Sequence, residues 1–153
     1  MTEATLSAAE LETLEAIAER LIPTDALGPG AVDAGAVAYI ERALGGAYAD
    51  RAERYRAGLA AVDVAAVRMH GDAFARLGAA GQDDVLAALE GSADASEREF
   101  FELVRGDILE GMFGDPSWGG NRDRAGWELI GYPGPRHVWT EDDQRLDVRP
   151  SPE

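Results

Sequence analysis

His70 and His137 are the two histidines of the chain, and they are the first candidates for acid–base chemistry. An imidazole titrates near neutral pH, so a histidine beside a carboxylate could move a proton to or from a substrate. Helical di-iron proteins instead use Glu-x-x-His pairs, but Val67 and Gly134 stand where the two glutamates would be. We expect His70 to end a helix, where an imidazolium would face the negative end of the dipole. His137 is expected in a late loop, exposed or packed beside Trp139.

The sequence lacks the residues for most covalent and metal chemistry. It has no cysteine, which excludes disulfides, thiol nucleophiles and cysteine-ligated iron–sulfur clusters. All 14 basic residues are arginine, so neither a P-loop lysine nor a Schiff-base lysine exists. Ser117 follows Asp115-Pro116, whereas a nucleophile elbow has glycine two residues before its serine. We therefore expect no catalytic, metal-binding or cofactor-binding residues in this chain.

The segment 114–135, GDPSWGGNRDRAGWELIGYPGP, differs from the helical sequence before it. Glycine and proline are costly inside helices, and exposed tryptophans leave apolar surface in water. Tryptophan, tyrosine and arginine are the residue types enriched where proteins bind each other most strongly. We predict a partner interface here, formed by Trp118, Asn121, Arg122, Asp123, Trp127 and Tyr132. The alternative is a return segment whose rings are buried on the helices and whose Asn121 and Arg122 bind backbone carbonyls.

The first half of the chain predicts three helices. Ser7 and Glu10 form a capping box that begins the first helix, and Pro23 ends it at Ile22. Residues 24–30 are rich in turn formers and should make a loop. Asp33 is the expected cap of a second helix of about a dozen residues, which Gly45-Gly46 ends. A third helix should run from residue 48 or 49 to about residue 70, with its apolar stripe formed by Tyr55, Leu59, Val62, Ala66 and Met69.

The second half predicts two further long helices. One covers residues 79–89, and the next begins at Ser96 with Glu99 completing a capping box. It ends at Phe113-Gly114, and its apolar positions are Phe100, Leu103, Val104, Ile108, Leu109 and Met112. Residues 124–130 could add one or two turns. No segment alternates with a period of two, so we predict an all-α, single compact domain of about five main helices over residues 1–139, followed by a polar tail over 140–153.

The formal net charge of −15 bears on partners and location. Nucleic acids and anionic membranes both need a basic surface, so we exclude them as partners. No apolar run approaches the roughly 20 residues that cross a bilayer. The N-terminal residues lack a basic region followed by an apolar one, so a cytoplasmic location is expected.

Several blocks of the sequence together resemble the gluconate 2-dehydrogenase subunit 3 family, over about residues 5–135. The last of them, the longest and the most specific, contains the glycine- and tryptophan-rich segment. The blocks are LSAAELETLEAIAERLIPTD, GPGAVDAGAVAYIERAL, YRAGLAAVD, FARLGAAGQDDVLAAL and FFELVRGDILEGMFGDPSWGGNRDRAGWELIGYPGP.

The resemblance implies a non-catalytic small subunit. Members of the family bind a larger flavoprotein of the glucose–methanol–choline type, which carries FAD and oxidises a sugar or an alcohol. The small subunit supports its folding, stability or maturation. In secreted members it also supplies a twin-arginine export signal, which we do not expect in this chain. Two alternatives stay open: an enzyme that uses His70, and a sugar-binding module in which Trp118 and Trp127 form a stacking platform.

Overall fold

The computed structural model describes residues 5–135 and residue 138, and these fold into helices joined by loops. No strand forms among the described residues, so the predicted all-α fold is confirmed. The five long helices that the sequence predicts are α1 to α5, and the expected turns around residue 127 form α6. The bounds are α1 Ala8–Leu21, α2 Ala36–Leu44, α3 Ala52–His70, α4 Ala79–Glu90, α5 Ala95–Phe113 and α6 Ala125–Leu129, with short 3-10 helices η1 Ala49–Arg51, η2 Phe74–Arg76, η3 Pro116–Trp118 and η4 Arg122–Arg124.

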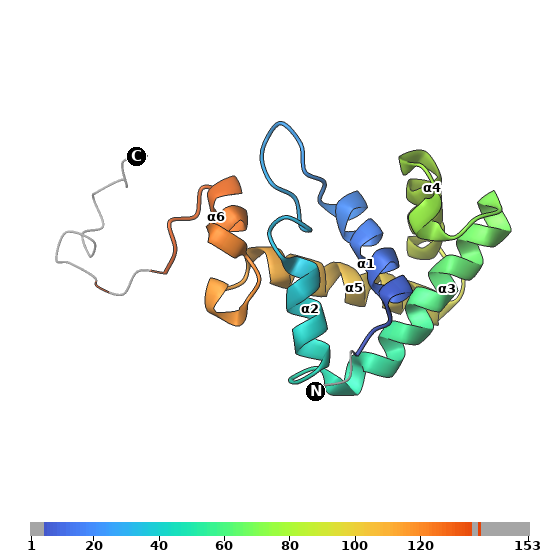
Figure 1. Ribbon diagram of the computed structural model, residues 1–153. Helices are drawn as coiled ribbons and strands as arrows, with labels where there is room; N and C mark the ends of the chain where they lie inside the picture. The colour runs from blue at the N-terminus through green and yellow to red at the C-terminus, as the bar shows by residue number, and fades with distance from the viewer. Residues whose placement is uncertain (1–4, 136–137, 139–153) are drawn as a thin grey trace.

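Helix α5 is the central element of the fold. It runs behind α1 and α2, with α4 towards one end of the molecule and α6 at the other (Figure 1). It contacts each of the other α-helices. One continuous core follows from this arrangement, and its largest fully buried side chains include Tyr55 of α3, Phe74 of η2 and Met112 of α5.

The start of α1 is as the sequence predicts. The Glu10 N–H donates to Ser7 Oγ at 3.3 Å, and the Ser7 N–H donates to Glu10 Oε2 at 2.7 Å. Both bonds of the capping box are therefore present, and each satisfies a backbone donor that the helix itself leaves unpaired.

Two predicted helix caps are wrong. The N-cap of α2 is Gly35, at φ 79°, and the Asp33 carboxylate instead accepts a hydrogen bond from Thr24 Oγ1 at 2.8 Å. Asp94 caps α5 by accepting from the Ser96 N–H at 2.8 Å, so Ser96 lies inside the helix. Asp33 is thus taken up by the loop before α2, and Asp94 provides a side-chain cap two residues before the predicted one.

Two predicted core residues lie on the surface. Met69 is 39% exposed and Leu109 is 43% exposed. Helical spacing finds the apolar face of a helix, but burial also requires another element to reach that turn. The predicted tail over residues 140–153, together with His137 and Trp139, lies outside the described residues, so the boundary at residue 139 stays a prediction.

Candidate partner-binding surface

The segment after α5, residues 114–135, folds back onto the end of that helix, and we call it the return segment. Figure 1 shows it turning through η3, η4 and α6 beside α2. Its glycines permit the close approach: a Cβ on Gly120 would overlap the carbonyl oxygen of Gly111, and one on Gly126 would overlap that of Met112. The backbone of the segment therefore lies directly on the backbone of the last turn of α5.

Asn121 fastens this segment from the inside. Its side chain is fully buried, donates from Nδ2 to the Gly114 carbonyl at 2.9 Å and accepts from the Gly126 N–H at 2.9 Å. Its own N–H donates to the Gly111 carbonyl at 2.7 Å, which the helix leaves without a partner. These contacts are those of the return-segment alternative: Asn121 binds backbone groups and offers no side-chain atom to a partner.

Trp127 also points into the molecule. It is 8% exposed, and its Nε1–H donates to the Phe113 carbonyl at 2.7 Å. The Tyr132 ring packs edge-on against it, with ring centroids 5.1 Å apart. Trp127 thus covers the end of α5, and its indole satisfies another of the last carbonyls of that helix.

Trp118 points outward. Its side chain is 58% exposed, although the backbone on either side is fixed. Arg42 of α2 donates to the Trp118 carbonyl at 3.4 Å and to the Gly119 carbonyl at 3.1 Å. A large apolar ring is therefore held in water by an ordered backbone, which is the arrangement expected of a binding residue.

The backbone between the two tryptophans is strained. Asn121, Asp123 and Arg124 have φ values of 43°, 54° and 62°, in the left-handed region that side chains other than glycine rarely adopt. The Arg122 N–H donates to the Ala34 carbonyl at 2.8 Å, which ties this turn to the start of α2. Such strain costs about 1–3 kcal/mol per residue and persists only where surrounding contacts hold it.

The six predicted interface residues thus divide into two groups. Asn121 and Trp127 are buried and build the segment. The other four are exposed and available to another protein: Trp118, Arg122, Asp123 and Tyr132.

Sequence reasoning missed Leu27, which is 83% exposed and lies across a cleft from Leu129. Its signal was a single large apolar residue inside a loop of turn formers.

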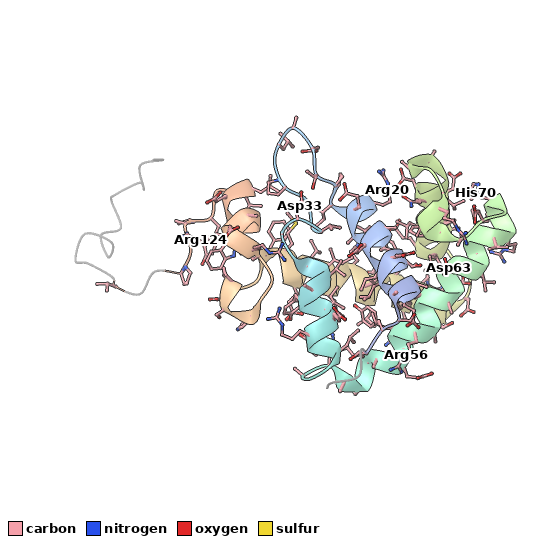
Figure 2. The ribbon with its side chains drawn as sticks, viewed as in Figure 1. Arg20, Asp33, Arg56, Asp63, His70 and Arg124 are labelled. Atoms are coloured by element: carbon pink, nitrogen blue, oxygen red, sulfur yellow. The ribbon has the colours of Figure 1, made fainter. Side chains whose placement is uncertain are left out.

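His70 lies where the sequence placed it, at the C-terminal end of α3. Its Nε2 is 3.6 Å from Asp84 Oδ2 of α4, and that carboxylate side chain is 65% exposed. Figure 2 shows His70 at the end of the molecule away from Arg124 of the return segment. In the part of the chain that the structure describes, no group of three or more histidines and carboxylates could hold a metal ion.

Asp107 is the most deeply buried carboxylate among the described residues, and its partners come from the chain itself. It accepts from the Tyr55 hydroxyl at 2.7 Å and from Arg51 Nη1 at 2.9 Å. Burial raises the pKa of Asp107 and outweighs the Tyr55 hydrogen bond and the Arg51 charge, which act to lower it. The same burial, together with the Asp107 charge, raises the pKa of Tyr55. This cluster links α3 to α5.

Comparison with known proteins gives one finding. A family model described as gluconate 2-dehydrogenase subunit 3 matches residues 8–134. No curated protein and no solved structure matches the chain. Within the described residues, every helix is too short or too polar to cross a bilayer.

Proposed function

The chain belongs to the gluconate 2-dehydrogenase subunit 3 family, and from this membership we propose that it is the non-catalytic small subunit of a dehydrogenase. Its partner is a larger FAD-dependent sugar or alcohol oxidoreductase of the glucose–methanol–choline type. FAD is carried by that partner, and this chain holds no cofactor. The observation that carries the proposal is the family match, which extends over almost all of the described residues.

The return segment supports the proposal from the physical side. It combines an internally fastened backbone with outward side chains, among them Trp118 and Tyr132. A surface that is already ordered before binding loses little conformational entropy when a partner covers it. These are the properties of a docking subunit.

The proposed action on the partner is stabilisation by mass action. A protein that binds only the folded form of another stabilises it by RT ln(1 + [L]/Kd), about 2.7 kcal/mol at one hundred times Kd. A small subunit with no chemistry of its own can therefore set how much folded flavoprotein accumulates.

The positions of Trp118 and Trp127 argue against the sugar-binding alternative. Stacking on a sugar requires exposed indole faces, but Trp127 is buried and its Nε1–H is bonded to Phe113. Of the two tryptophans of that platform, Trp118 alone is exposed. A flat tryptophan fluorescence response to added sugars would agree with this.

Co-expression with a larger FAD-dependent oxidoreductase of the glucose–methanol–choline type from the same genome tests the proposal. We expect the two to elute together in size-exclusion chromatography, and the flavoprotein to melt several degrees higher in the complex than alone. The small chain purified by itself should show no flavin absorbance and no dehydrogenase activity. Separate elution at micromolar concentration, with an unchanged melting temperature, would show that the proposed function is wrong.

A further inference from the structure

Exposed apolar side chains gather around the return segment and the loop that faces it. Of the ten large apolar side chains exposed among the described residues, five belong to these two stretches. A gathering of this kind on a protein surface marks a site of interaction. The five are Leu27, Trp118, Leu129, Ile130 and Tyr132.

Leu27 is held out by a rigid turn. Asp25 and Gly28 exchange two backbone hydrogen bonds, of 3.1 and 3.2 Å, and the Leu27 N–H donates to Asp25 Oδ1 at 2.8 Å. At the base of the loop, the Gly30 N–H donates to Thr24 Oγ1 at 2.9 Å. The loop projects from the molecule between α1 and α2 in Figure 1. The tip of the loop is therefore ordered, while the Leu27 side chain lies in water and adds no apolar burial within this chain.

The Leu27 turn forms one wall of a cleft, and α6 forms the other. Leu27 and Pro29 line the first wall, and Ala125 and Leu129 line the second. Where the walls meet, the Leu129 side chain lies within van der Waals distance of a Cβ placed on Gly28. The cleft thus carries apolar side chains on both walls, beside the charged side chains of its lining.

Charge around the cleft is mainly negative. Asp33, Asp123 and Glu128 line it against a single cation, Arg122. Figure 2 places Asp33 at the base of the loop that precedes α2. Within the residues that the structure describes, neither Asp123 nor Glu128 forms an ion pair. Apolar walls with unpaired carboxylates at the rim match a segment that carries an apolar side chain next to an arginine or a lysine.

We propose that the cleft between the Leu27 turn and α6 is the docking site for the large dehydrogenase subunit. A segment of that subunit inserts an apolar side chain between Leu27 and Leu129, and its neighbouring basic residue pairs with Asp123 and Glu128. The inference rests on the proposed function for the identity of the partner. It adds the surface, the anchoring residue and the charge of the segment that binds there.

Two variants of the cleft test the inference against two matched variants of the far end. Leu27→Asp removes the exposed anchor, and Val67→Asp makes the same kind of change at a 53% exposed position of α3. Glu128→Arg reverses a rim charge, and Glu90→Arg reverses an exposed charge at the end of α4. All four positions are exposed, so each variant should keep the melting temperature of the wild-type chain.

The measurement is the Kd of each purified variant for the large flavoprotein subunit. We expect Leu27→Asp to raise Kd at least tenfold and Glu128→Arg at least threefold, with both far-end variants within twofold of wild type. Wild-type affinity in both cleft variants, or loss of binding by Val67→Asp alone, would overturn the docking site while leaving the proposed function intact. Failure of the wild-type chain to bind the large subunit would overturn both. Self-association of the wild-type chain that Leu27→Asp abolishes would assign the cleft to a second copy and overturn the inference.

Discussion

In this protein, residue type does not show whether a side chain lies in the interior or on the surface. Arginine, asparagine and tryptophan in a glycine-rich segment suggest recognition, yet Asn121 and Trp127 face inward and satisfy backbone groups. Leu27, a residue type usually found in cores, is almost fully exposed. Function at the residue scale therefore depends on which way the backbone points each side chain.

Replacing Asn121 tests its role as a fastener. Asn121→Ala removes both side-chain hydrogen bonds, leaves the Gly126 N–H unpaired and keeps a Cβ at positive φ. We expect a loss of about 2–3 kcal/mol in the free energy of unfolding. Asn121→Gly, the matched variant, removes the same bonds but relieves the backbone, so it should cost about 1 kcal/mol less. Urea unfolding measures both, and equal stability of Asn121→Ala and wild type would contradict the fastening role.

The raised pKa of Asp107 predicts how its contribution to stability changes with pH. The folded protein binds the Asp107 proton more tightly than the unfolded chain does, so this residue stabilises the fold below the unfolded-state pKa of about 4. That stability is lost as pH rises through the higher, folded-state pKa. The unfolding free energy of wild type minus that of Asp107→Asn should therefore decrease from acidic to neutral pH.

Asp83 supplies a control of opposite sign for that experiment. Its hydrogen bond with Arg20 lowers its pKa, so its contribution is present at neutral pH and lost on acidification. Denaturant unfolding of wild type, Asp107→Asn and Asp83→Asn over the same pH range gives both trends. Parallel trends for the two variants would show that the assignment for Asp107 is wrong.

At the scale of elements, close packing on α5 organises the fold. The return segment lies on its last turn, and α3 crosses it where Gly58 meets Phe100. The Phe100 ring also packs edge-on against Tyr55, with centroids 5.8 Å apart. Small residues at these positions set how closely the elements approach.

Two glycine-to-alanine variants separate packing from helix propensity. A Cβ on Gly58 would overlap the Phe100 ring, so Gly58→Ala should destabilise the protein by about 1–3 kcal/mol. We expect this loss although alanine has the higher helix propensity. Gly106 of α5 has open space around it, and Gly106→Ala should stabilise by about 0.5–1 kcal/mol. Thermal unfolding of the two purified variants gives both signs, and a gain in Gly58→Ala would contradict the close contact.

Elements were predictable from the sequence where the signal is local. The capping box at Ser7, the stop before Pro23 and the helical spacing of α3 to α5 depend on neighbours in the chain. The first two are confirmed. The spacing found the three helices, but it wrongly placed Met69 and Leu109 in the core. The predicted caps of α2 and α5 were wrong because Asp33 accepts a hydrogen bond from Thr24, and because Asp94 accepts one from the Ser96 N–H. Leu27 and Trp127 could not be oriented from the sequence, since their exposure depends on contacts distant along the chain.

At the scale of the whole molecule, the described residues form an acidic helical body with a cleft at one end that carries apolar side chains on both walls. Its net charge of −15 sets a negative field around the apolar cleft. A partner with basic residues would be attracted before the apolar surfaces meet.

Association with the large subunit should therefore weaken with salt. Raising NaCl from about 0.1 M to about 1 M shortens the Debye length from about 10 Å to about 3 Å. We expect Kd to rise several-fold, mainly through a slower association rate. Biolayer interferometry with immobilised large subunit measures both, and sucrose at matched osmolality is the control. A Kd that is unchanged or lower at high salt would contradict charge-assisted docking.

The two walls of the cleft have a consequence for biosynthesis. One wall comes from residues 27–29 and the other from residues 125–129, so they are made at opposite ends of the translated domain. A ribosome that has released α1 to α4 has produced most of the core, yet no docking site exists on the nascent chain. The site is completed only when the return segment emerges and closes the end of α5. The large subunit would thus engage finished copies alone, and assembly would itself report that folding is complete.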